Sequence, residues 1–231
     1  LMRGDFALEQ PLASQLAGVV QQVTVIFATL LLPELSVMVV QGQHDRIRMM
    51  MERVLPYWLL GTSVLFTLVL LGARAGLPLV FGPSYAGAAP VLALLMVASG
   101  ALALFNSCTS LVGAFGSTWV LTGISFASIA VNVVGNLVLI PRFGITGSAM
   151  STVLAYLMGG VLILAFVQYR LGGKILRLAW LGTPVVVGYL CFSVFDDVWF
   201  YPAAVGLATL NVVALVMAFR LFRAEDAAFF R

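Results

Sequence analysis

The chain has 231 residues, of which 62% are hydrophobic and only 9% are charged. A soluble domain carries roughly 45 to 50% apolar and about 25% charged residues, so this composition excludes a soluble globular domain and predicts a lipid environment. It also excludes nucleic-acid modules, secreted disulfide scaffolds and disordered tails, and the net charge of +3 says little about partners because membrane proteins distribute Lys and Arg by loop orientation.

Seven apolar runs are long enough to cross a bilayer, since a transmembrane helix takes about 20 residues. In chain order they lie at about 12–40, 54–73, 88–112, 117–140, 144–168, 178–195 and 198–219. Polar residues, Gly and Pro separate them, with a Gly/Pro-rich break at 76–87 and a turn marked by Pro141 and Gly144. We expect helices, because runs of this length satisfy their own backbone hydrogen bonds in lipid. The predicted fold class is an all-α polytopic membrane protein of about seven transmembrane helices.

Prolines and small residues mark places where these helices can bend or approach closely. The prolines in or beside apolar runs are Pro33, Pro56, Pro90 and Pro184, and the missing backbone donor at each permits a kink, although prolines are also common in static membrane helices. The fifth run has small residues at strict four-residue intervals, namely Gly147, Ser151, Ala155 and Gly159. This spacing favours tight helix packing, with a hinge or a ligand groove as the alternative.

Polar side chains form stripes on three of the predicted helices. In the fourth run, six of them fall within an arc of about 120° at roughly 100° per residue. They are Thr118, Thr122, Ser125, Ser128, Asn132 and Asn136. The third run presents Ser99, Asn106 and Ser110 on one face, and the first run has Gln15, Gln22, Thr29 and Ser36 at seven-residue spacing.

An amide in hydrocarbon needs a partner, so these stripes face either protein or water. A single stripe is compatible with a polar helix-packing interface, whereas three stripes together favour the wall of a hydrated cavity. The predicted lining residues of that cavity are Asn132, Asn136, Ser125, Thr122, Asn106 and Gln22.

The sequence contains no convincing set of catalytic or metal-binding residues. His44 stands beside Asp45 in a polar loop, and Asp196 and Asp197 are consecutive residues in a turn, where their side chains diverge. Cys108 and Cys191 lie in apolar runs, which indicates no disulfide framework. We therefore predict a protein that is not an enzyme and that uses no metal or cofactor.

The distribution of basic residues predicts the orientation of the chain. Nine of them follow the first, fifth and seventh runs, and three lie on the other side. The positive-inside rule then places the loops at His44 and Lys174 and the C-terminus in the cytoplasm, and the loops at Ser84 and Asp196 outside. An outside N-terminus suggests that the first run is an even-numbered helix of a larger bundle.

Two sequence elements resemble a known family. Residues 81–89, FGPSYAGAA, resemble an FG-x-x-Y-x-x-A element, and residues 132–149, NVVGNLVLIPRFGITGSA, resemble the signature N-x-x-x-N-x-x-L-I-P-x-[YF]-G-I-x-G-A-A of polysaccharide flippases. These flippases belong to the multidrug/oligosaccharidyl-lipid/polysaccharide exporter superfamily. The resemblance covers about residues 33–170. Gly116-Ser117 departs from it, because the family often has Gly-Arg or Gly-Lys there.

The resemblance implies an architecture and an activity. Family members have two six-helix lobes around a central cavity, often followed by two extra helices, so residues 1–173 would form a partial C-terminal lobe and 174–231 the extra pair. They flip undecaprenyl-pyrophosphate-linked oligosaccharides across the bacterial inner membrane for the synthesis of surface polysaccharides such as O-antigen, lipopolysaccharide and exopolysaccharide. The implied partners are this lipid-linked oligosaccharide, the bilayer, and either a first lobe or another copy of the chain.

Three alternatives remain open at this point. One is a multidrug or cation exporter of the same fold, for which Glu34 is the candidate coupling carboxylate. Another is a membrane-bound transferase that modifies the same glycan, and the third is an assembly subunit that does not transport.

Overall fold

The structure is a computed structural model, and it describes residues 6–172, 175–194 and 201–218. This part of the chain is almost entirely helical, with six segments long and apolar enough to cross a membrane and a shorter apolar helix at 202–218. The predicted class, an all-α polytopic membrane protein of about seven helices, is therefore confirmed.

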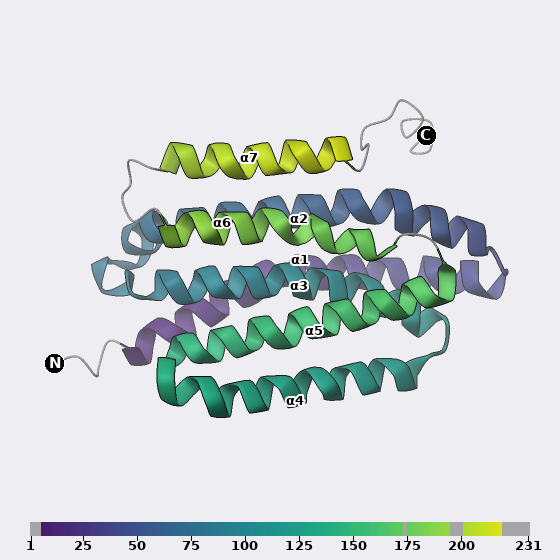
Figure 1. Cartoon of the computed structure of the whole chain (residues 1–231), viewed down its shortest axis with the longest axis horizontal. Helices are drawn as coiled ribbons and strands as arrows, with labels where there is room; N and C mark the ends of the chain where they lie inside the picture. The colour runs from purple at the N-terminus through teal and green to yellow at the C-terminus, as the bar shows by residue number, and fades with distance from the viewer. Residues whose placement is uncertain (1–5, 173–174, 195–200, 219–231) are drawn as a thin grey trace.

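The helices run nearly along one common axis (Figure 1). In chain order they are α1 (Phe6–Val40), α2 (His44–Phe81), η1 (Pro83–Tyr85), α3 (Ala88–Ala114), α4 (Thr118–Phe143), α5 (Ile145–Leu171), η2 (Ile175–Gly182), α6 (Thr183–Val194) and α7 (Tyr201–Ala218). Here η denotes a 3-10 helix.

Helix α2 is much longer than the predicted span at 54–73. It has 38 residues, and at about 1.5 Å per residue it is roughly 57 Å long, against about 30 Å for the bilayer core. Its first turns are polar, and Arg48 pairs with Glu52 one turn later at 3.0 Å. The helix also continues through Pro78, which we had expected in a break. The hydropathy of the sequence predicts only the apolar part of a helix. Helix α2 is longer because its backbone hydrogen bonding continues into the residues on either side of that part.

The prolines have different roles from the ones predicted. Pro141 lies inside α4 instead of in a turn, and the turn is made by Gly144, whose φ of 57° is a conformation that favours glycine. Pro90 and Pro184 lie in the first turns of α3 and α6, where a missing N–H leaves no helical hydrogen bond unmade, so they do not require a kink.

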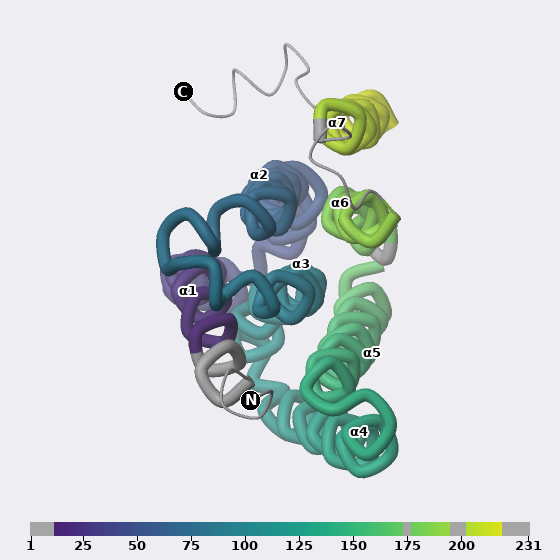
Figure 2. Tube along the Cα trace, turned by 90° about the vertical axis from the view of Figure 1, so that its left-hand side faces the viewer, coloured from purple at the N-terminus to yellow at the C-terminus, as the bar shows by residue number. Residues whose placement is uncertain are grey.

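Helix α3 lies at the centre of the bundle. Of its apolar span 78% is buried, against 6% for α4. Viewed along the bundle (Figure 2), α3 lies among α1, α2 and α5, while α4 lies at one edge beyond α5 and α7 lies at the other edge beyond α6. Several fully buried side chains belong to this helix, among them Met96, Cys108 and Leu111.

Helix α6 and the preceding η2, which contains Leu181, both pack against α2. The hydroxyl of Ser63 donates a hydrogen bond to the carbonyl oxygen of Leu181 at 2.6 Å, and Arg74 donates to the carbonyl oxygen of Phe192 at 2.8 Å. The predicted boundary at 173/174 lies outside the described residues.

Candidate functional site

A hydrogen-bonded polar cluster joins α4 to α5. The side-chain amide of Asn136 donates to the amide oxygen of Asn132 at 3.0 Å, and the hydroxyl of Ser151 donates to the amide oxygen of Asn136. The amide of Asn132 reaches the hydroxyl oxygen of Thr152 at 3.4 Å. The structure therefore brings Asn132 and Asn136 together, one turn apart, and pairs them with α5.

Within the described residues, this cluster leaves some hydrogen-bond donors without a partner. Each asparagine amide carries two N–H groups, and each uses one of them inside the cluster. Both side chains are half-buried. One N–H group of each amide thus remains for an acceptor oxygen outside the cluster, such as a sugar hydroxyl.

The other polar residues of the α4 stripe point along the same arc. Thr122 donates to the carbonyl oxygen of Thr118 at 3.0 Å, and Ser125 is half-buried. The hydroxyl of Ser128 is buried and has no hydrogen-bond partner within the described residues. Ser128 faces Gly159, where a Cβ would come 2.7 Å from its oxygen, so its hydroxyl fills the space that the glycine leaves.

The third-run stripe occupies a different interface. The amide of Asn106 donates to the hydroxyl oxygen of Thr24 at 3.1 Å, and the hydroxyl of Ser110 donates to the carbonyl oxygen of Ala28 at 2.6 Å. Asn106 therefore lies between α1 and α3, and not with Asn132 and Asn136.

Gln22 lies on the exposed side of α1, and its neighbour Gln21 is the residue that faces α3. The amide of Gln21 donates to the hydroxyl of Ser99 at 2.8 Å. The seven-residue spacing predicted Gln22 as the residue that faces the bundle, and it did not predict Gln21. A usable signal was present in the small residues Ala17, Thr24 and Ala28, which mark the face of α1 that packs closely on another helix.

The small residues of α5 lie in contact with two helices. Gly147, Ser151, Ala155 and Gly159 are all buried. Gly147 lies against the carbonyl group of Leu139 in α4, and Gly159 lies against Ser128 in α4 and Phe105 in α3. Gly135 of α4 contributes to the same packing, since a Cβ there would come 2.6 Å from the Cβ of Ser151.

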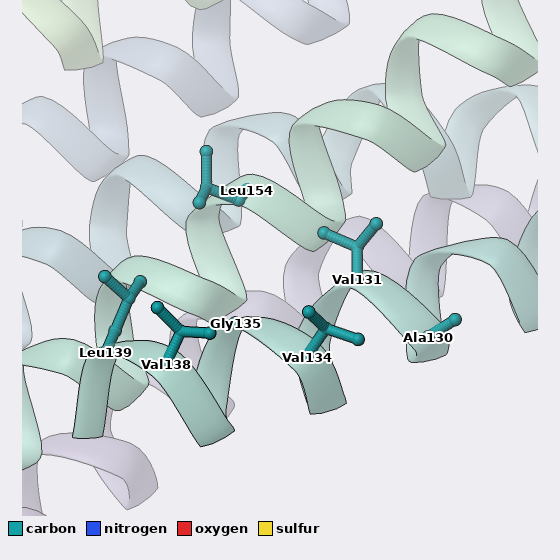
Figure 3. A pocket seen from close by; sticks show the side chains of 7 residues that line it. All are labelled: Ala130, Val131, Val134, Gly135, Val138, Leu139 and Leu154. Atoms are coloured by element: carbon teal, nitrogen blue, oxygen red, sulfur yellow. The ribbon is translucent and has the colours of Figure 1, made fainter. Parts of the chain in front are cut away.

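An apolar groove of about 480 Å³ runs along α4 beside α5 (Figure 3). Its lining residues are Ala130, Val131, Val134, Gly135, Val138, Leu139 and Leu154. All of them except Leu154 belong to α4, the helix that also carries Asn132 and Asn136. The sequence did not predict this groove, because a run of valines in a membrane helix looks the same whether it lines a groove or faces lipid.

The remaining candidate groups lie apart from this cluster. His44 stacks on Phe115 with their ring centroids 6.4 Å apart, and Glu34 is exposed on α1. Cys108 and Cys191 are free and buried. The described residues include no group of three or more His, Cys, Asp or Glu that could hold a metal ion. Asp196, Asp197 and Lys174 lie outside the described residues.

Comparison with known proteins supports the membrane class alone. No family model and no solved structure matches the chain. A curated relative, described as an uncharacterized membrane protein of Methanocaldococcus jannaschii, is 30% identical over 132 residues. The match covers 56% of this chain and 26% of the relative, so the chain spans about a quarter of the relative's length. Taken with the six long apolar helices, this likeness identifies the chain as a membrane protein with several spans.

Proposed function

We propose that this chain is part of a transporter that flips an undecaprenyl-pyrophosphate-linked oligosaccharide across the bacterial inner membrane, with its C-terminus in the cytoplasm. The observation that carries the proposal is the half-buried pair Asn132 and Asn136 in a membrane helix. The same residues open the segment 132–149 that resembles the flippase signature.

The unused N–H groups of this pair suit a glycan. Sugar hydroxyls and acetamido groups offer many acceptor oxygens, and an amide in a low-dielectric site gains from meeting one. Thr122 and Ser125, half-buried on the same arc of α4, extend the polar surface along the helix. The glycan would move along this surface while its polyprenyl tail stays in lipid.

Alternating access would need a second bundle. In transporters of this general kind, one bundle rocks against another around a shared site. We therefore propose that a first lobe, or another copy of this chain, completes the cavity that the α4 residues line.

Complementation of a flippase-deficient bacterium tests both proposals. The chain alone should not restore surface polysaccharide, and the chain supplied together with a separate first lobe should restore it. In the restored strain, replacement of Asn132 and Asn136 by Leu should abolish most transport while leaving membrane abundance nearly unchanged, because one interhelical hydrogen bond in a membrane averages only about 0.6 kcal/mol.

A matched variant controls for the loss of an amide as such. Asn211→Leu removes an amide from α7, where Asn211 accepts a hydrogen bond from Thr183 at 3.3 Å, and it should leave transport intact. A collapse of abundance in the double variant would make the α4 cluster a structural element. A drug-export phenotype lost in Glu34→Gln would favour the exporter alternative.

A further inference from the structure

Three large amphipathic side chains are exposed at one end of the bundle. Trp119 at the start of α4 is 88% exposed, Tyr169 at the end of α5 is 85% exposed, and Trp180 in η2 is 65% exposed. The α1–α2 and α3–α4 turns lie at this same end, since His44 and Arg170 both contact Phe115. Trp and Tyr in such positions are typical of the level where lipid headgroups meet the hydrocarbon.

The geometry of η2 places a cation beside one of these aromatic residues. A 3-10 helix has three residues per turn, so side chains three apart lie on the same side. Leu178 and Leu181 are 3% and 0% exposed and fix η2 to the bundle. Arg177 and Trp180, three residues apart, are both exposed and form the outward side of η2.

A second cation is held nearby at the end of α5. The guanidinium carbon of Arg170 lies 5.5 Å from the centroid of the Phe115 ring, while its side chain stays exposed. Helix η2 packs against α5, so Arg170 and Arg177 belong to adjoining elements. The face of a phenyl ring attracts the guanidinium without neutralising its charge.

Among the described residues, this surface carries an unbalanced positive charge. The sequence of α5 and η2 contains no acidic residue, and the described carboxylates near this end, Glu34, Asp45 and Glu52, belong to α1 and α2. Glu52 is paired with Arg48. Within the described residues, neither Arg170 nor Arg177 has a carboxylate partner.

We propose that Tyr169, Arg170, Arg177 and Trp180 form a binding surface for the headgroup of an anionic glycerophospholipid from the surrounding bilayer. A guanidinium recognises phosphate oxygens through paired N–H donors, and the indole and phenol rings bury their apolar edges among the acyl chains while their polar atoms remain at the headgroup level. The buried leucines hold η2 in place, so the surface is formed before the lipid binds.

Quenching of Trp180 fluorescence by brominated lipids measures this binding directly. Trp58, Trp119 and Trp199 are changed to Phe in the full chain. The Trp58 substitution removes an indole N–H that has no partner in the described structure. The protein is reconstituted in two kinds of lipid mixture. In one, phosphatidylglycerol is brominated and phosphatidylcholine is not, and in the other only phosphatidylcholine is brominated. We expect phosphatidylglycerol to be preferred by at least fivefold, and the preference to fall as salt is added.

Three variants separate a specific surface from general attraction. Arg177→Gln should lower the preference by about fivefold, in line with the usual contribution of one basic residue near a membrane surface. Arg177→Lys, which keeps the charge and loses the paired donors, should have a preference between those of the unchanged protein and Arg177→Gln. Arg142→Gln removes an exposed cation from the opposite end, at the close of α4, and should have no effect.

Each contrary result overturns the proposal. Equal quenching by the two brominated lipids would show that the surface has no headgroup preference. An equal effect of Arg142→Gln and Arg177→Gln would show that only the net charge matters. Displacement of phosphatidylglycerol by millimolar inorganic phosphate would assign the site to a soluble anion.

Discussion

Arg74 connects two helices through two different interactions. Its guanidinium donates a hydrogen bond to the carbonyl oxygen of Phe192 at 2.8 Å, and its guanidinium carbon lies 4.3 Å from the centroid of the Phe192 ring. Both contacts hold the last turn of α6 against α2. Arg74 is one of the three basic residues, with Arg3 and Arg142, that the sequence assigns to the outside of the membrane. Its role as a connection between helices depends on Phe192, which lies more than a hundred positions away in the sequence.

Removal of this guanidinium should loosen α6. We expect Arg74→Met, which keeps an apolar side chain of similar reach, to raise the rate at which a membrane-permeant maleimide modifies Cys191 by about tenfold, since a hydrogen bond from a charged donor contributes roughly 1.5 to 3 kcal/mol. Cys108, buried in α3, is the internal reference and should stay unreactive. Arg142→Met is the matched control, and an equal acceleration there would assign the effect to lost charge alone.

At the level of elements, the sequence predicted the helices better than their pairing. Composition and run length gave the class and the approximate spans, because hydrophobicity over about 20 residues is a strong signal. The sequence does not show which helix each polar stripe faces. A stripe indicates only that one side of its helix is polar. For this reason the sequence could not show that Asn106 and Asn132 belong to different interfaces. It also could not show the close packing at Gly135, because that contact is with Ser151 of another helix.

The contact of Gly135 with Ser151 predicts a sharp effect of one methyl group. In Gly135→Ala the new Cβ would come 2.6 Å from the Cβ of Ser151 and 3.4 Å from its Cα, so the backbones of α4 and α5 must separate. We expect a loss of roughly 1 to 3 kcal/mol in stability, typical of overpacking, measured as a lower melting temperature in detergent. Gly123→Ala lies in the same helix with nothing within 4 Å and should be neutral or slightly stabilising. Equal melting of the two variants would contradict the close α4–α5 contact.

For the whole molecule, the two ends of the bundle differ in charge, and this difference predicts which end faces the cytoplasm. His44 begins α2 and Ser84 lies in η1 just after that helix ends, so the two residues lie at opposite ends of a helix long enough to cross a membrane. Both residues are exposed. The positive-inside rule assigns the His44 end to the cytoplasm, because Arg46, Arg170 and Arg177 lie there.

Cysteine labelling in intact cells checks this orientation. In a chain with Cys108 and Cys191 replaced by Ala, Ser84→Cys should react with a membrane-impermeant maleimide, and His44→Cys should react only after the cells are opened. The reverse pattern would invert the topology. Reaction of both in intact cells would mean that the chain inserts in two orientations.

The central place of α3 has a consequence for how the protein is made. Two of the three most extensive contacts join α1 to α3 and α3 to α5, helices that run in the same direction and are separated in sequence by an intervening span. Synthesis proceeds at about 5 to 20 residues per second, so α1 enters the membrane several seconds before α3 is complete. During that interval the face of α1 formed by the small residues Ala13, Ala17, Thr24 and Ala28 is not yet covered by α3. Asn106 can pair with Thr24 only after α3 has entered the membrane, so the contact between α1 and α3 forms after α1 has been inserted.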